Sequence, residues 1–423
     1  MLHKLLYIFA LYLPFQIAIN PVPGIDLASI RIFSLIIFFI WLASSLQSKS
    51  IYIPNKFLTF LITSFLFFCF FSTLTAENIW WSARKLLFLL SFIPLFLVIN
   101  GISWNKNKLQ TFCSYLVLGA GISASIGIFQ FILQFFIGVR NTTIFWFDAT
   151  MPFLGKTFSM AVFQYNSWLV EIGDTTLMRA ISFFPDPHMF SFYLSMIFPV
   201  SLALYFLTYK KQYFFISILI LIANFLSFSR GGYLGFLSGL LFFLILISTK
   251  KMEKFQNLKY YVGIFSTLLL LIIFIPNPIN QRFLSSFNIN EGSNSERIQI
   301  WSQALHIIKE NPFFGVGIGN YSSATNSNSD YRTPIYAHNT YLDIAVETGI
   351  ISAIIWITLI LWSIIKLARN KSNILFFGFS AGIIAFSVHS FFDTAIFSVH
   401  ILPVLIFFSS FAIIKYDSNT SIL

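Results

Sequence analysis

The stretch YFFISILILIANFLSFSRGGYLGFLSGLLFFLILIS, residues 213–248, contains a single charged residue, Arg230. It consists of two apolar runs that are joined by SRGG with almost no loop between them. A helix needs about 20 mainly apolar residues to cross the hydrocarbon layer of a membrane, so each run predicts one span. Gly231 and Gly232 allow the backbone to turn tightly between the two spans.

The composition extends this prediction to the whole chain. Of its 423 residues, 57% are hydrophobic and only 10% are charged, 55 are phenylalanine, and the mean hydropathy is +0.80. Soluble domains lie far from these values, so we expect an all-α polytopic membrane protein that forms one integral membrane domain over 1–423. About twelve transmembrane helices are predicted, beginning near residues 4, 27, 57, 86, 109, 188, 213, 232, 260, 341, 373 and 399.

Other classes of protein are disfavoured. Cys69 and Cys113 both fall inside predicted spans, without the spacing of a disulfide framework or a metal site. The net charge is +11, but the basic residues are divided among loops and do not form one stripe, so we do not expect nucleic acid as a partner. The first apolar run has no small-x-small cleavage site after it and is expected to stay as an uncleaved anchor.

Lysine positions predict the orientation, because short cytoplasmic loops collect positive charge. With a cytoplasmic N-terminus, twelve spans place fourteen of the seventeen lysines on the inner side. The protein is therefore expected to be a multi-pass protein of the bacterial plasma (inner) membrane with both termini cytoplasmic. Two long segments, 139–187 and 276–340, then become extracytoplasmic loops, and loops of this length are usually functional or disordered.

Arginines follow the opposite distribution. Eight of the nine are expected on the outer side, at positions 31, 84, 140, 179, 230, 282, 297 and 332. Lysine is sufficient as a topology signal, whereas only arginine offers a planar fork that pairs bidentately with phosphate oxygens. Some of these arginines can instead reach lipid headgroups or form loop salt bridges. The others indicate an anionic ligand.

Two arginines stand out. Arg230 lies at the membrane boundary, where a charge is costly unless it is paired, and this favours a functional role over an interfacial anchor. In residues 293–312, apolar side chains at helical spacing predict an amphipathic helix on the outer membrane face. Arg297 falls in its first turn, where the helix dipole disfavours a cation. A bound anion would explain that position, and a solvated polar face is the alternative.

Two further motifs, and the lack of a third, give little support to metal or nucleotide chemistry. The turn GVGIGN, residues 315–320, resembles a phosphate loop, but no predicted strand precedes it. The stretch FPDPH, residues 184–188, offers Asp186 and His188 without a third metal ligand. No Asp-x-Asp pair is present in the outer loops to hold a divalent cation, so we expect phosphate chemistry to depend on arginine.

His338 precedes an apolar run, in YAHNTYLDIAVETG, residues 336–349. Asn339 is a candidate helix N-cap, and Asp343 and Glu347 favour the N-terminal turns of a helix. An ordinary helix start explains the asparagine but not the histidine. A neutral imidazole next to an acceptor hydroxyl is a competent general base near neutral pH. Residue chemistry alone leaves both interpretations open.

Four stretches resemble the shared domain of the O-antigen ligase family, which also includes O-antigen and exopolysaccharide polymerases. In chain order they are SRGG (229–232), ERIQIW (296–301), NPFFGVGIGNY (311–321) and HNTYLDIAVETGI (338–350). The resemblance covers about residues 179–365. It implies a glycosyltransferase of the GT-C type that needs neither metal nor cofactor and takes a glycan from undecaprenyl diphosphate on the outer side of the membrane.

The resemblance also implies roles for single residues. Arg230 and Arg297 would bind the diphosphate, and His338 would activate the acceptor hydroxyl. Arg179 resembles a further family arginine, and Arg84 is added to the diphosphate-binding set from its position alone. The implied partners are an undecaprenyl-diphosphate-linked glycan, a lipid or glycan acceptor, and membrane lipids.

The acceptor is left open by the sequence. Lipid A core as acceptor would make the protein a ligase, and a second lipid-linked glycan would make it a polymerase. A transporter or lipid-glycan flippase would also fit twelve spans. The chain has no internal repeat and few ionisable residues deep within its predicted spans, and this disfavours a transporter.

Overall fold

The computed structural model describes residues 1–22, 25–49, 51, 55–164, 167–173, 175–249, 280–282, 292–326, 329, 336–414 and 416–417. Within these ranges seven helical segments are long and apolar enough to cross a membrane. They are α2 (Ser29–Gln47), α3 with η2 (Lys56–Thr75), α4 with α5 (Ile79–Gly101), α6 (Lys106–Ile137), α9 (Pro187–Thr208), α11 (Arg230–Ser248) and α17 (Ile350–Arg369). The all-α polytopic membrane fold is thereby confirmed.

Four shorter apolar helices occupy further predicted spans. They are α1 with η1 (Leu2–Phe15), α10 (Lys211–Leu226), α18 (Ile374–His389) and α19 (Ile401–Phe411). The span predicted near residue 260 lies outside the described residues.

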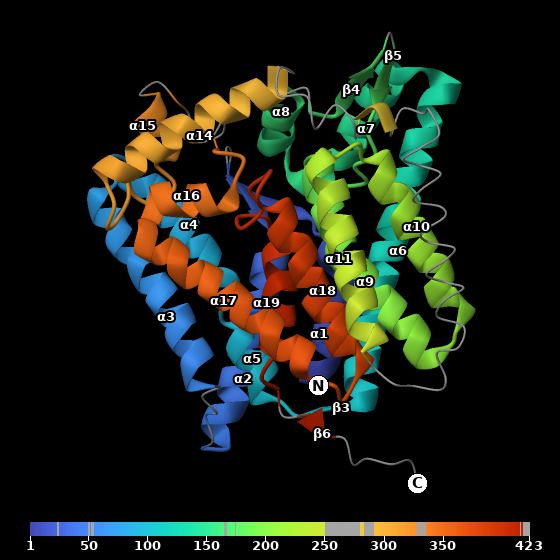
Figure 1. The fold of residues 1–423 in the computed structure, drawn as a ribbon, viewed down its shortest axis with the longest axis vertical. Coiled ribbons are helices and arrows are strands. Elements are labelled where there is room, and N and C mark those ends of the chain that lie inside the picture. The colour runs from blue at the N-terminus through green and yellow to red at the C-terminus, as the bar shows by residue number, and fades with distance from the viewer. Residues whose placement is uncertain are drawn as a thin grey trace.

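Helix α9 forms the centre of the bundle, where it packs mainly against α18, α10 and α11 (Figure 1). It is apolar on all sides, and 94% of its most apolar window is buried, as expected for a helix that is surrounded by other helices. Its N-terminus is fixed by Asp186, whose side chain accepts a hydrogen bond of 2.9 Å from the backbone N–H of Met189. The start of α9 is therefore a rigid place for a side chain.

A row of small residues lets α11 approach α18 closely. Gly231, Gly235 and Gly239 recur every fourth residue along α11 and face α18. A Cβ atom at Gly235 would lie 2.7 Å from the carbonyl oxygen of Ala385, so a larger residue there would push the two helices apart. This contact brings the N-terminus of α11 next to the C-terminus of α18.

Asparagine N-caps begin five of the helices. Asn55, Asn78, Asn105, Asn339 and Asn373 each accept hydrogen bonds from backbone N–H groups in the first turn of the helix that follows. The cap predicted at Asn339 is confirmed. It satisfies the N–H groups of Tyr341 and Leu342 at the start of α16 (Thr340–Thr348).

The described parts of both predicted outer segments contain regular secondary structure. The first contains α7 (Val139–Leu154), α8 (Lys156–Gln164) and an antiparallel hairpin of β4 (Leu169–Ile172) and β5 (Thr175–Met178). In the second, α14 (Gly292–Glu310) lies across one end of the bundle above α4 and α16, with α15 (Tyr321–Thr325) beside it (Figure 1).

The N-terminus and the last described strand lie at the other end of the bundle. The start of α1 and the short parallel pair of β3 (Trp104–Asn105) and β6 (Tyr416–Asp417) are found there, opposite α14 (Figure 1). A further antiparallel pair, β1 (Ala18–Val22) and β2 (Ile25–Ala28), follows the first span. Which end faces the cytoplasm stays a prediction.

The span predicted to begin near residue 341 is wrong in its first turns. Residues Thr340–Thr348 form α16, and the long apolar helix α17 begins only at Ile350. Gly349 separates the two helices with a φ of +91°, and the N–H of Ile350 donates a hydrogen bond to the carbonyl of Pro312 instead of continuing α16. Glu347 and Thr348 stand directly before this break, and the uninterrupted apolar run begins only at Ile350.

Candidate active site

His338 lies in the short segment before α16 and faces Asp393, a residue of the loop between α18 and α19. Its Nδ1 lies 3.4 Å from the Oδ1 of Asp393. An ionised carboxylate can only accept, so the proton of the neutral imidazole is held on Nδ1 and Nε2 keeps its lone pair. The His338 side chain is 45% exposed, so this lone pair can be reached from outside. Such an imidazole is arranged to take up a proton.

The backbone at His338 is in the left-handed region, with a φ of +48°, which is uncommon for a residue other than glycine. Both flanks of the residue are held. The N–H of Ala337 donates to Asp343 at 2.8 Å, and the indole of Trp301 donates to the carbonyl of Ala337 at 2.8 Å. The N–H of Thr340 donates to the carbonyl of Ser390 at 2.9 Å. Strained conformations of this kind persist where the surrounding structure fixes them, often at functional sites.

Asp393 is buried and was not identified from the sequence. Its carboxylate accepts from the N–H of Thr394 at 2.9 Å, and its carbonyl accepts from the hydroxyl of Thr340 at 3.0 Å. The hydroxyl of Thr394 also donates to Asp343 in α16. The loop that contains Asp393 is thus attached to the helix that follows His338. The two residues are 55 positions apart, and no local spacing signal links them.

The pKa values of this pair shift in the directions that suit a base and its anchor. Burial by itself would lower the pKa of His338, but the hydrogen bond and negative charge of Asp393 raise it above its ordinary 6.5, against a smaller lowering by the cation of Arg297. Burial would raise the pKa of Asp393, but the imidazoles of His188 and His338 hold it well below its usual range. Asp393 is therefore ionised at neutral pH.

Arg297 and Arg230 belong to two helices whose N-terminal parts lie near this site. Arg297 acts electrostatically on His338 from the first turns of α14, and one turn later Trp301 docks α14 on the segment 336–339. Arg230 is the first residue of α11 and is only 6% exposed. The preceding residue, Ser229, caps α11 and lies 3.0 Å from the Nδ1 of His188. Arg297 thus acts on His338 directly, whereas Arg230 belongs to the start of α11, where Ser229 contacts His188.

Arg179 is buried and makes three hydrogen bonds to backbone carbonyls. Its guanidinium donates to Ser227 at 2.8 Å, to Ser167 at 3.0 Å and to Phe228 at 3.2 Å. Burial and the nearby charge of Arg282 lower its pKa to about 9. In this structure Arg179 holds the backbone that leads into Arg230, and Arg282 is a further cation nearby that sequence reasoning left out of the site.

Arg84 is exposed on α4, and its neighbour Lys85 is the residue that faces the site. Lys85 is buried, with its Nζ 2.8 Å from the Oε1 of Glu347 in α16. The same ammonium lies 5.2 Å from the ring centre of Tyr336, two residues before His338. The sequence selected Arg84, whereas the side chain of α4 that contacts α16 is that of the next residue, Lys85.

The glycine-rich turn 315–320 connects α4 to α16, as expected for a turn and not for a phosphate loop. The hydroxyl of Ser82 donates to the carbonyl of Ile318, and the amide of Asn320 donates to Ser82 at 2.9 Å. On the other side, the N–H of Val316 donates to the carbonyl of Val346 at 2.9 Å. The N-terminal helices therefore support the segment that positions His338.

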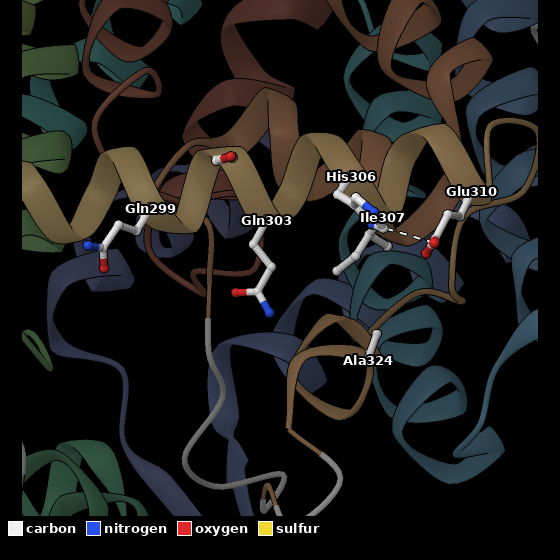
Figure 2. A pocket seen from close by; sticks show the side chains of 7 residues that line it. Gln299, Gln303, His306, Ile307, Glu310 and Ala324 are labelled. Carbon is white, nitrogen blue, oxygen red and sulfur yellow. Dashed lines mark ion pairs between the residues drawn. The ribbon is translucent and has the colours of Figure 1, made fainter.

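A separate open groove lies on the far side of α14. It is lined by Gln299, Gln303, His306 and Glu310, and Ala324 of α15 lies opposite (Figure 2). Nine residues, or two and a half helical turns, separate Arg297 from His306, so the two side chains point to opposite sides of α14. The groove is therefore not the site that Arg297 serves.

No group of three or more His, Cys, Asp or Glu side chains within the described ranges is arranged to hold a metal ion. His188 belongs to the stretch FPDPH, for which the sequence offered no third metal ligand. In the structure it contacts Asp393. Independence from metal stays a prediction.

The fold and this site define an integral membrane protein in which a histidine and an aspartate pair at one end of a helical bundle, with Arg297 acting on the histidine and Arg230 following Ser229, which contacts His188. Residues 215–357 match the family model described as O-antigen ligase (Wzy_C), and this match confirms the resemblance in the region of Arg230, Arg297 and His338. It supports an O-antigen ligase- or polymerase-like function in the synthesis of cell-surface polysaccharide. Arg84, Arg179 and Asp393 lie outside the matched region. A comparison with curated proteins found no match.

Proposed function

We propose that the protein is a glycosyltransferase that moves a glycan from undecaprenyl diphosphate to an acceptor hydroxyl at the outer surface of the bacterial inner membrane. The observation that supports this most directly is the pairing of His338 with Asp393, with the cation of Arg297 acting on the same imidazole. The match of residues 215–357 to the O-antigen ligase model supports the same reaction class.

His338 is the general base. Its Nδ1–H faces the carboxylate of Asp393, so its Nε2 can accept the proton of an acceptor hydroxyl. Asp393 fixes the tautomer and orientation of the imidazole and stabilises the imidazolium that forms, as an aspartate does behind a catalytic histidine in other enzymes.

Arg230 and Arg297 bind the diphosphate. The acceptor oxygen forms a bond to the anomeric carbon while the bond from that carbon to the diphosphate oxygen breaks, and the electron pair leaves with the diphosphate. Inversion at the anomeric carbon is expected. The two guanidinium groups stabilise the negative charge that builds on the leaving group. Arg179 supports the backbone that precedes Arg230, and Arg84 stays in the diphosphate set as a prediction from the sequence.

The test is a transfer assay with the purified full-length protein in lipid nanodiscs. The donor is an undecaprenyl-diphosphate-linked glycan, and the acceptors are lipid A core in one reaction and a second lipid-linked glycan in another. Transfer to the first acceptor identifies a ligase, and chain extension on the second identifies a polymerase. Activity should persist in excess EDTA. Transfer to neither acceptor would contradict the proposal. Loss of activity on chelation would contradict a mechanism that depends on arginine and not on metal.

A further inference from the structure

His188 lies on the other side of the Asp393 carboxylate from His338. Its Nδ1 is 3.4 Å from Oδ2 of Asp393, while the Nδ1 of His338 is 3.4 Å from Oδ1. One carboxylate is therefore shared between two imidazoles, each on a different oxygen atom. The mechanism above uses only one of them.

The backbone of His188 is rigid. It follows Pro187 at the start of α9, and Asp186 caps this helix by accepting from the N–H of Met189 at 2.9 Å. The helix behind it is the most deeply buried span in the described part of the chain. A side chain at this place can hold a loop residue such as Asp393 in position, because its own backbone is fixed by the helix.

His188 also connects the Asp393 side of the site to the start of α11. Its Nδ1 lies 3.0 Å from the hydroxyl of Ser229, the N-cap of α11, and that hydroxyl lies 3.4 Å from the Nε2 of His389. The ring of His389 stacks on Phe192 with centroids 3.5 Å apart, and this fixes it. Arg230 directly follows Ser229, so the contacts of His188 run from the aspartate behind the base to the helix that presents an arginine.

The charges around this chain of contacts come from several elements. The groups that act on His188 are Asp393 of the loop after α18, Arg179 of the segment before α9, Arg297 of α14 and His389 of α18. Those that act on His338 are Asp393, Arg297 and Asp343 of α16. Among these groups, Asp393 is the residue that contacts both imidazoles directly, with one carboxylate oxygen near each.

We propose that His188 is a positioning residue, which holds Asp393 in place for His338 and limits how strongly that carboxylate acts on the base. The polar edge of the His188 imidazole, 3.4 Å from Oδ2, offsets part of the negative charge of the carboxylate. Without it, the whole charge of Asp393 acts on His338, and the imidazolium form of His338 becomes more stable. The loss of His188 should therefore move the acidic limb of activity to higher pH. This inference rests on the proposed role of His338 as general base.

The experiment compares four variants with the wild type in the full-length protein. His188→Ala removes the imidazole, and His188→Asn keeps a polar amide near the position of Nδ1. Asp393→Asn removes the negative charge and is expected to shift the pH dependence in the opposite direction. His306→Ala is the matched control, because His306 is exposed on the far side of α14 and pairs only with Glu310 among its described contacts.

Two readouts are needed. The first is the dependence of glycosyl transfer on pH. The second is the NMR titration of the His338 ring in protein with labelled histidine and no substrate, assigned by comparison with His338→Ala; the chain has six histidines to resolve. We expect His188→Ala to raise the His338 titration midpoint and the acidic limb by about half to one pH unit, the effect of one lost polar contact to a carboxylate. His188→Asn should return the midpoint and the acidic limb most of the way to the wild-type values.

The outcomes separate this inference from the proposed function. A His338 midpoint that is unchanged in His188→Ala, whatever happens to the rate, would overturn the inference and leave His188 as a packing residue. A shifted midpoint in a protein that transfers no glycan would support the contact between His188, Asp393 and His338 and would contradict the proposed function instead. An equal shift in His306→Ala would also overturn the inference, because it would show a general effect of charge.

Discussion

The ammonium group of Lys85 lies 2.8 Å from one carboxylate oxygen of Glu347 and 3.1 Å from the other, although the two residues are 262 positions apart in the chain. Both side chains are buried, and the ammonium also lies 4.2 Å from the ring centre of Phe397. The pair joins α4 to α16, the helix that begins directly after His338. An N-terminal span thereby contributes to the position of the proposed base.

Breaking this ion pair on one side should destabilise the protein strongly. Lys85→Met leaves the Glu347 carboxylate buried without its partner, which costs about 3–5 kcal/mol in other proteins. The double variant Lys85→Met/Glu347→Leu removes both charges and should recover most of the lost stability, because two apolar side chains of similar size can replace a buried pair. The measurement is the free energy of unfolding in detergent micelles. A single variant as stable as the wild type would show that the pair is not buried as described.

Arg230 and Arg297 should not tolerate lysine. A bidentate contact to diphosphate depends on the planar fork of the guanidinium, which a lysine ammonium lacks although its charge is the same. We expect Arg230→Lys and Arg297→Lys to lose most of their transfer activity at matched expression. Arg369→Lys is the control, since Arg369 lies in the last turn of α17, away from the site. Donor binding is measured with labelled undecaprenyl-diphosphate glycan, and unchanged binding and turnover in both variants would remove the arginines from the mechanism.

His338→Ala should bind donor but transfer it slowly. The imidazole is assigned to the acceptor, so donor affinity should change little, while turnover should fall by about 10²- to 10⁴-fold, the usual effect of a lost general base. Full activity in this variant would reduce His338 to a residue that begins a helix.

The wild-type pH profile tests the same assignment. The pKa of His338 is raised above 6.5, and only its neutral form can accept a proton, so activity should rise with pH through a midpoint above 6.5. His338→Ala should lose this acidic limb and keep only its low residual rate. An acidic limb that persists unchanged in the variant would assign the titration to another group.

Topology is tested with fusions to a reporter that is active only after export. The lysine distribution predicts that a reporter fused after Glu310, at the end of α14, is exported, and that one fused after Lys210, between α9 and α10, stays in the cytoplasm. A cytoplasmic reporter after Glu310 would place the site on the wrong side of the membrane for a donor that is presented outside.

The sequence by itself determined the class of fold and selected three residues of the proposed site. Apolar runs of sufficient length predict spans because a backbone in hydrocarbon must satisfy its own hydrogen bonds, and helices do this locally. Arg230, Arg297 and His338 could be selected because the sequence gives each an unusual local setting: a charge at the membrane boundary, a cation in the predicted first turn of a helix, and an imidazole before an apolar run. The structure begins α14 earlier, at Gly292, so Arg297 is its sixth residue.

The tertiary structure alone decided which residues act together. Asp393 belongs to a loop 55 residues after His338, and Lys85 meets Glu347 across most of the chain. It also showed that Arg179 binds backbone carbonyls and that Gly349 separates α16 from the spanning helix α17. Hydropathy and helical spacing describe a residue and its neighbours within a few turns. A shared carboxylate or a buried ion pair depends on distances between helices, and only the packing of those helices fixes them.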